Sequence, residues 1–246
     1  MKLTVAYDGT DFHGSQLQPG LRTVQGVLQQ ALLAVTGEAI VAEFAGRTDA
    51  GVHAAGQVVS LSTSFGHGPD AMARAINANT PDDLAVLIAE EVEPEFSARH
   101  SARQRWYRYT IDTAPVARPL RRRYAASNLR PLDVAAMNAA AKPLLGWHDF
   151  SGFGAVPNDE SSPVRRLDQL EAFRDGDVVT VDIKGSAFLR HMARNLVSYL
   201  TGSNAPARGL CLEAVSYEGL PGAKPLDQDI LPLPLKAGAR GGFPRS

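Results

Sequence analysis

An aspartate and an arginine stand two residues apart in a segment that otherwise has the composition of a turn. The segment AGRTDAGVHAAGQVV covers residues 45–59, and Gly46 and Gly51 flank its charged centre, Arg47 and Asp49. Glycines let a backbone turn tightly and come close to a ligand, so such a loop presents its carboxylate. The neighbouring arginine is suited to hold a phosphate while the carboxylate works. On residue types alone, a strand connection with Asp49 as an ordinary turn residue is the simpler explanation.

The sequence lacks the usual motifs for cofactors, metals and activated nucleophiles. Its six histidines form no pair with metal-ligand spacing on a shared element, and its one cysteine cannot complete a zinc site. It contains no Walker loop, no G-x-G-x-x-G and no G-x-S-x-G. We therefore expect no metal and no cofactor, so that any catalysis depends on side chains and on positioning of the substrate.

The overall composition is that of an ordinary water-soluble globular protein, with 44% hydrophobic and 21% charged residues. The longest apolar stretches are shorter than the roughly 18 residues that a membrane helix needs. The N-terminus MKLTVAYDG turns polar too early for a signal peptide. With a single cysteine, these features predict a cytoplasmic protein without a membrane partner.

Positive charge is concentrated in one stretch of the chain. Residues 99–130 contain nine arginines and one acid, Asp112, so this window carries +8 and the remainder −9 within a net charge of −1. A block of this kind on a folded chain favours a surface that faces a polyanion. A solvated basic face without a partner explains the charge equally well.

Apolar periodicity and turn residues predict two successive βαββαβ series, the split ferredoxin-like unit. In the first, strands are expected at 2–9, 39–46, 56–63 and 84–92, with helices at 23–37 and 70–81. In the second, strands are expected at 105–113, 165–173, 177–185 and 210–218, with helices at 131–146 and 187–200. Thr23 is placed to cap the first helix at its start and Gly37 at its end.

This order predicts an α+β fold with two ferredoxin-like halves. We expect the halves to form an extended, mostly antiparallel sheet with helices on one face. The expected domains are 1–97, which carries the Asp49 loop, and 98–246, which carries the basic segment and a loosely ordered C-terminal tail.

Several motifs, in order along nearly the whole chain, resemble those of the tRNA pseudouridine synthase A family. GRTDAGVHA with the following GQV resembles the family signature, and YDGTDFHGSQLQ (7–18) its opening motif. FSARHSARQRWYRYTI (96–111), GSAFLRHMARNLV (185–197) and NAPARGLCLEAVSY (204–217) resemble its central segment, late helix and closing strand.

The resemblance implies a role for four residues. Asp49 matches the catalytic aspartate, and Tyr107 the tyrosine that stacks on the target base. Arg194 matches the arginine that pairs with the aspartate, and Arg47 the arginine that contacts the flipped-out nucleotide. Each has a structural alternative: Tyr107 as a core aromatic, Arg194 as a solvated helix residue and Arg47 as a turn arginine.

The implied activity is isomerisation of uridine to pseudouridine at positions 38, 39 and 40 of the tRNA anticodon stem-loop, by a homodimer without cofactor. Two alternatives remain open. One is a non-catalytic structured-RNA-binding module, although a carboxylate facing phosphates would oppose binding. The other is a carboxylate-dependent hydrolase of small substrates, although such enzymes usually need a second carboxylate.

The chain departs from the family pattern at two places. Ser15 stands where the family often has tryptophan, and the connection at 200–210 is short, where relatives carry an extra helix. We expect these changes to alter a packing or RNA contact and one edge of the RNA cleft, without touching the four site residues.

Overall fold

The structure, a computed structural model, describes residues 1–128, 130–156 and 162–218. The chain forms two compact units. Unit 1 comprises Met1–Arg105 and Leu210–Glu218, and among the described residues unit 2 comprises Trp106–Gly209. The expected C-terminal tail lies almost entirely outside the described residues.

Unit 1 is a sheet with two helices. Its elements are β1 (Lys2–Tyr7), α1 (Val24–Thr36), β2 (Glu43–Phe44), β3 (His53–Ser60), α2 (Pro69–Asn77), β4 (Leu84–Glu90) and β10 (Leu210–Ser216). β1 lies between β3 and β4 and is antiparallel to both. On the other side of β3, β2 pairs antiparallel and β10 parallel. The first six elements follow the predicted βαββαβ order.

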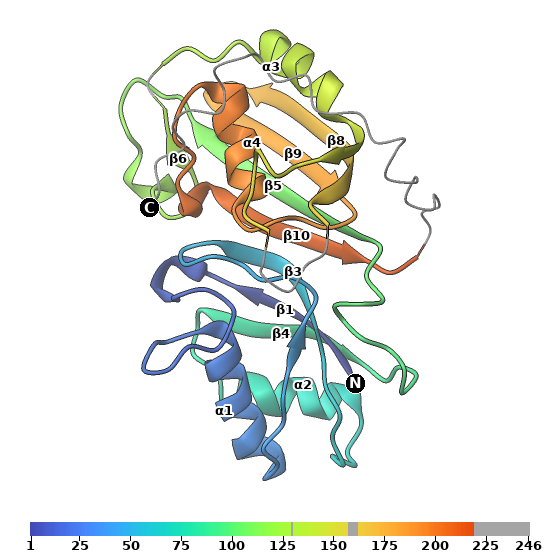
Figure 1. Cartoon of the computed structure of the whole chain (residues 1–246). Coiled ribbons are helices and arrows are strands. Elements are labelled where there is room, and N and C mark those ends of the chain that lie inside the picture. Colours follow the sequence, from blue (N-terminus) through green and yellow to red (C-terminus); the bar gives the residue numbers. More distant parts are fainter. Residues whose placement is uncertain (129, 157–161, 219–246) are drawn as a thin grey trace. The chain divides into compact units, whose positions relative to one another are not determined.

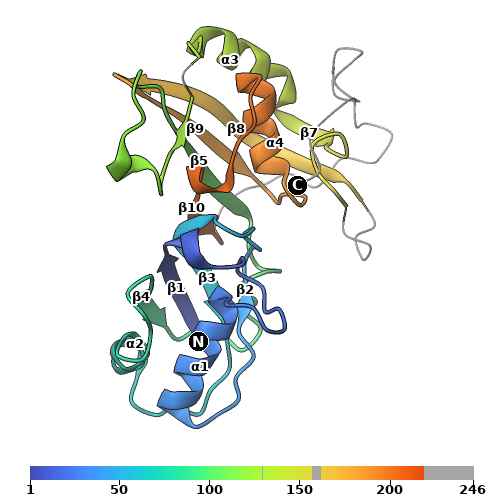
Figure 2. The ribbon, with the colours of Figure 1, turned by 90° about the vertical axis from the view of Figure 1, so that its left-hand side faces the viewer.

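The apolar stripe of α1 explains why this helix lies against the sheet. Val24, Leu28 and Leu32, which share one helix face, are fully buried. The predicted caps are confirmed: Thr23 accepts the N–H of Gly26, and Gly37 ends the helix at φ 73°. Figures 1 and 2 show α1 and α2 beside the same sheet.

Within its described residues, unit 2 is also a sheet with two α-helices. Its elements are β5 (Gln104–Asp112), β6 (Ala126–Ser127), α3 (Val134–Ala141), β7 (Gly146–Asp149), β8 (Val164–Asp175), β9 (Val178–Gly185) and α4 (Met192–Thr201). It contains two short strands, β6 and β7, that the expected βαββαβ order lacks. The strand order is β5-β9-β8-β7, with β6 paired to β5. The predicted Asp-Gly turn joins β8 to β9, with Gly176 at φ 54°.

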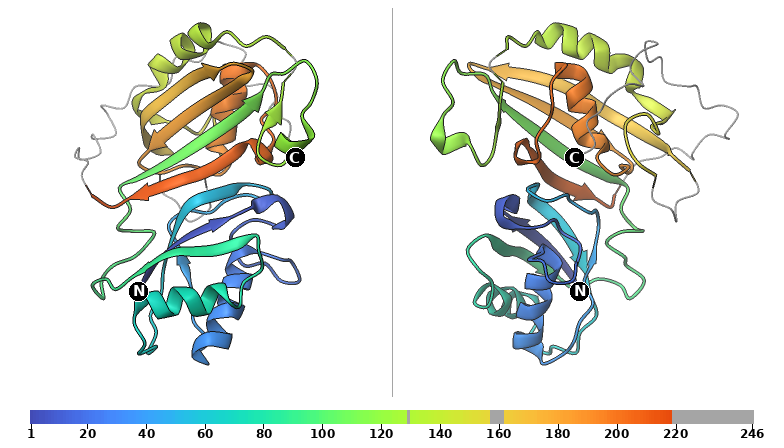
Figure 3. Two further views of the ribbon diagram at one scale, coloured as in Figure 1. Left: turned by 180° about the vertical axis from the view of Figure 1, so that it is seen from behind. Right: turned by 60° about the vertical axis from the view of Figure 1, so that its left-hand side comes forward.

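Helix α4 covers one face of the unit 2 sheet. It lies in front of the strands in Figure 1 and behind them in the left panel of Figure 3. Along β5, Tyr107, Tyr109 and Ile111 are buried, whereas the alternate residues Trp106 and Arg108 are half-buried. This alternation assigns Tyr107 to the buried face of the strand. The α+β class is confirmed in both units.

Several predicted elements are wrong in their extent. The strand expected at 56–63 is His53–Ser60, and the helix expected at 70–81 is Pro69–Asn77. The strand at 39–46 is reduced to Glu43–Phe44, because glutamine side chains of α1 bond the backbone of Ala42 instead of a neighbouring strand. The helix expected from residue 131 begins at Val134, where Asp133 caps it by accepting the N–H of Ala136.

The late helix, expected from residue 187, begins only at Met192. His191 adopts φ 66° and is the one described non-glycine residue with positive φ. A left-handed residue cannot continue a right-handed helix. The contacts also group β10 with unit 1, although chain order makes it the last strand of the second series. The domain division at 97/98 stays a prediction.

Candidate active site

The loop with Asp49 and Arg47 connects β2 to β3 in unit 1. Arg47 is exposed and Asp49 is half-buried. The N–H of Val52 donates to the carbonyl of Asp49 at 3.1 Å, which closes a four-residue turn. Gly51, the third residue of that turn, has φ 77°, the conformation that a type II turn demands of this position. The turn therefore begins at Asp49 and fixes the direction of the chain after this residue.

Two buried polar side chains, Tyr7 and Gln57, form hydrogen bonds to the loop. The hydroxyl of Tyr7 is hydrogen-bonded to Oγ1 of Thr48 at 2.8 Å, and Nε2 of Gln57 donates to the carbonyl of Gly46 at 2.7 Å. Burial raises the pKa of Tyr7 to about 12, so its hydroxyl stays neutral at physiological pH. Buried polar groups whose hydrogen bonds are all made fix a local conformation, because breaking these hydrogen bonds costs free energy.

The segment Gly9–Ser15 packs on the loop from the other side. Ser15 makes two hydrogen bonds to the backbone of Thr48, and the N–H of Gly51 donates to the carbonyl of Phe12 at 3.3 Å. A Cβ placed on Gly9 would lie 2.0 Å from the carbonyl oxygen of Val52. The glycine in YDG is therefore required by close backbone approach. Periodicity and spacing gave no sign of this contact, because the two segments are about forty residues apart in sequence.

Tyr107 and Arg194 lie in unit 2. Tyr107 is 6% exposed, and its ring packs edge-to-face on Phe188 with 5.0 Å between centroids. Arg194 is half-buried in the first turn of α4, where its Nε donates to the carbonyl of Ala205 at 2.8 Å. Asp49 and Arg47 thus belong to one unit, and Tyr107 and Arg194 to the other. The pairing of Arg194 with Asp49 and the stacking of Tyr107 on a base stay predictions.

The basic window of residues 99–130 contains arginines of two kinds. Arg105 is 8% exposed and donates to the carbonyls of Ala45, Arg99 and Ala102. Arg108 binds Asp182 through two hydrogen bonds of 2.7 and 2.8 Å. These two side chains serve the folded structure, which the charge pattern does not reveal.

Other arginines of the window lie close together in unit 2. Arg118 pairs with Asp177, and Nη1 of Arg121 lies 3.9 Å from the buried carboxylate of Asp112. Arg122 and Arg123 are exposed. The exposed side chains are therefore the part of the window that is accessible to a polyanion.

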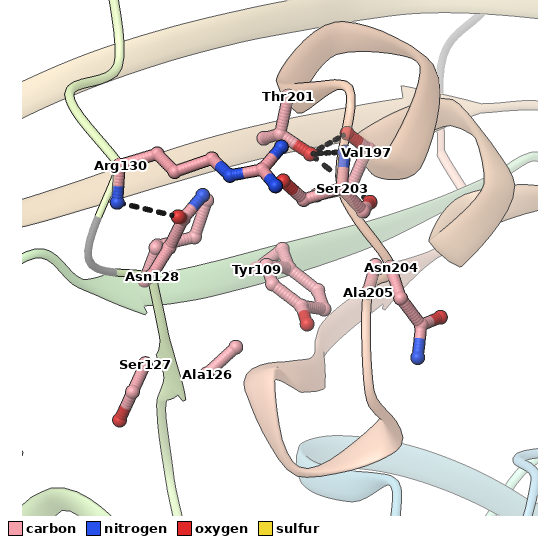
Figure 4. Close-up of a pocket in the computed structure, with 11 residues that line it drawn as sticks. Tyr109, Ala126, Ser127, Asn128, Arg130, Val197, Thr201, Ser203, Asn204 and Ala205 are labelled. Atoms are coloured by element: carbon pink, nitrogen blue, oxygen red, sulfur yellow. Dashed lines mark hydrogen bonds between the residues drawn. The ribbon is translucent and has the colours of Figure 1, made fainter.

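A hollow of about 340 Å³ lies near the end of α4 in unit 2 (Figure 4). The short connection after α4 supplies part of its wall through Ser203, Asn204 and Ala205, and Tyr109 and Arg130 also line it. None of the four predicted site residues lines the hollow. Ala205, which lines the hollow, accepts the hydrogen bond of Arg194.

Comparison with known proteins identifies the kind of enzyme to which this loop belongs. The family model described as tRNA pseudouridine synthase matches residues 3–101 and 140–203, which include Asp49 and Arg194. The chain therefore belongs to the tRNA pseudouridine synthase family, and it is an enzyme of the isomerase class. Membership decides against the non-catalytic module and the small-substrate hydrolase.

Relatives are similar over most of their own length. The tRNA pseudouridine synthase A of Pelobacter propionicus is 39% identical over 241 residues, covering 88% of this chain and 99% of the relative. That of Moorella thermoacetica is 40% identical over 243 residues, covering 88% and 99%. That of Roseiflexus castenholzii is 43% identical over 243 residues, covering 87% and 89%.

Proposed function

We propose that the protein converts uridine to pseudouridine at positions 38, 39 and 40 in the anticodon stem-loop of tRNA, with Asp49 as the catalytic aspartate. The observation that carries this proposal is the construction of the Asp49 loop. Gln57 and Ser15 are hydrogen-bonded to its backbone and Tyr7 to the side chain of Thr48, while Asp49 itself remains partly accessible. A rigid scaffold that presents one carboxylate suits a reaction that depends on positioning.

The reaction needs one carboxylate and no change of oxidation state. The C1′–N1 bond of the uridine breaks, the uracil rotates, and a C1′–C5 bond forms. The hydrogen on C5 leaves as a proton and N1 gains a proton, so the product is an isomer. Three roles for ionised Asp49 fit this balance: attack on C1′, attack on C6, or removal of the 2′ proton.

The other site residues help to bind the target nucleotide after its base has left the stack. The target nucleotide has to leave its stack, which costs a few kcal/mol. Stacking on Tyr107 is worth about 1–3 kcal/mol and offsets part of that cost. In this proposal Arg47 contacts the flipped nucleotide, and Arg194 places a positive charge beside Asp49, which favours the ionised carboxylate. Exposed arginines such as Arg122 and Arg123 bind the surrounding phosphates.

We also propose that the enzyme acts in the cytoplasm as a homodimer with the RNA crossing both subunits. None of the helices within the described ranges is long and apolar enough to cross a bilayer. Light scattering at working concentration measures the oligomeric state, and an active monomer would contradict the dimer.

Tritium release from carbon 5 of uridine tests the substrate assignment. tRNA transcripts carry labelled uridine and differ only at positions 38, 39 and 40, where each uridine is replaced in turn by cytidine. We expect release to fall with each replaced uridine and to be absent from the triple replacement. Equal release from the triple replacement would contradict the assigned positions, and no release from any tRNA would contradict the proposed activity.

A further inference from the structure

We propose that Ser15 is a positioning residue for the reaction, because it fixes the two peptide groups that lead into Asp49. This inference rests on the proposed catalytic role of Asp49. Ser15 itself is 1% exposed, so it acts through the loop and not through contact with RNA.

The hydrogen bonds of Ser15 hold Thr48 on both sides. Its Oγ accepts the N–H of Thr48 at 2.9 Å, and its own N–H donates to the carbonyl of Thr48 at 3.0 Å. The first bond belongs to the peptide group between Arg47 and Thr48, and the second to the peptide group between Thr48 and Asp49. Rotation of this second peptide group would swing the Asp49 side chain, so the clamp limits that motion.

The surroundings of Ser15 are built for this contact. Gly14 has φ 90°, and a Cβ placed on it would lie 2.9 Å from the carbonyl oxygen of Thr48. Glycine there lets the two backbones approach closely enough for both bonds of Ser15. The side chain of Thr48 is held separately by Tyr7. Every hydrogen-bonding group of Thr48 therefore has a partner, and Thr48 is only 6% exposed.

The side chain at position 15 has to be an acceptor for this arrangement. A serine hydroxyl accepts through two lone pairs, whereas the indole of tryptophan only donates. A tryptophan at position 15 could not accept the N–H of Thr48, so this hydrogen bond depends on the serine that the chain carries.

Removing the hydroxyl has a specific consequence for the loop. Ser15→Ala keeps the backbone bond to the carbonyl of Thr48 but leaves the buried Thr48 N–H without an acceptor. One missing oxygen atom does not make room for a water molecule. The loop then relaxes away from its position, and a displacement of about 1 Å can cost on the order of 100-fold in rate.

Ser60 provides a matched control within unit 1. It is also buried, and its Oγ also accepts a backbone N–H, from Ala98 at 2.9 Å. It ends β3, while the Asp49 loop precedes the other end of that strand. Ser60→Ala and Ser15→Ala therefore both remove a hydroxyl that accepts a buried backbone N–H. Ser60→Ala also removes a longer bond of 3.3 Å that this hydroxyl donates to Glu43. Only Ser15 is bonded to the catalytic loop itself.

The experiment compares single-turnover tritium release from tRNA at saturating enzyme with the Kd for tRNA. We expect Ser15→Ala to slow release about 10- to 100-fold and to leave Kd within about twofold, while exchange of the Thr48 amide hydrogen becomes faster. Ser15→Thr, which keeps the acceptor, should recover most of the rate. Ser60→Ala should lower the melting temperature to a similar extent and keep the wild-type rate.

Several results would overturn the inference. These are a wild-type rate for Ser15→Ala, an equal loss for Ser60→Ala, or no recovery in Ser15→Thr. If Ser15→Ala does not fold, Ser15→Cys replaces it, since its sulfur is a weaker acceptor, and a wild-type rate there would count equally against the clamp. Asp49→Asn in the same series separates the two claims: if it keeps turnover, the proposed function fails, whatever Ser15 does.

Discussion

The same substitution should have different effects at two arginines of the basic window. At Arg105 it should lower the stability of the fold, and at Arg122 it should reduce the salt dependence of tRNA binding. The guanidinium of Arg105 is buried and donates to three backbone carbonyls, of which Ala45 directly precedes the Asp49 loop. Arg122 is exposed. Changing either residue to glutamine removes one positive charge, so net charge alone predicts equal effects.

The contacts of Arg105 give the expected size of its effect on stability. Its Nη2 lies 2.8 Å from the carbonyl oxygen of Ala45 and 3.0 Å from that of Arg99, and a third bond, from Nη1, is longer at 3.3 Å. A hydrogen bond from a charged donor contributes about 1.5–3 kcal/mol. Arg105→Gln should therefore lower the free energy of unfolding by about 3 kcal/mol, while an exposed substitution such as Arg122→Gln stays within about 0.5 kcal/mol.

Urea unfolding and the salt dependence of tRNA binding measure the two effects. Each phosphate contact that is lost lowers the slope of log Kd against log salt by about 0.7–0.9. We expect Arg122→Gln to flatten this slope without changing the urea midpoint, and Arg105→Gln to shift the midpoint without flattening the slope. A flattened slope with unchanged stability in Arg105→Gln would refute the assignment of this arginine to the folded structure.

Two further predictions concern tyrosines. Tyr107→Phe should fold normally and lose activity only if the hydroxyl takes part in proton transfer or positioning, whereas Tyr107→Ala should lose activity in either case; wild-type turnover in Tyr107→Ala would remove this residue from the site. Because the folded-state pKa of Tyr7 is raised to about 12, its contribution to stability is complete below pH 10 and is lost as pH rises toward 12, up to about 2–3 kcal/mol. Unfolding measured between pH 8 and 12 should therefore show a smaller alkaline loss in Tyr7→Phe than in wild type, and equal losses would contradict the buried neutral hydroxyl.

Local patterns in the sequence predicted the helices and strands well where caps and apolar spacing agree. The first helix is the clearest case, because Thr23 and Gly37 mark its ends and its buried residues share one face. The late helix is the opposite case. AFLRHMARNL has a continuous helical pattern, and nothing in it predicts that His191 takes a left-handed conformation. The surrounding fold fixes that conformation, so local propensity cannot predict it.

Motifs in the sequence predict candidate site residues, but they do not predict the contacts that support the Asp49 loop. The position of Asp49 followed from its motif, which is contiguous in sequence. The contacts that hold its loop come from Tyr7, Gln57 and Ser15, which only folding brings together. The basic window shows the same limit, because counting charges cannot separate the buried Arg105 from the exposed Arg122.

The substitution Asp49→Asn tests the catalytic role of Asp49 most directly. The substitution removes the charge with almost no change in volume, and asparagine tolerates the same turn conformations, so the melting temperature should change little. Binding of tRNA should hold or tighten slightly, since a negative charge near phosphates is gone. Tritium release from carbon 5 of uridine, measured without cofactor and with chelator present, should be lost. Release at the wild-type rate would contradict the catalytic role of Asp49.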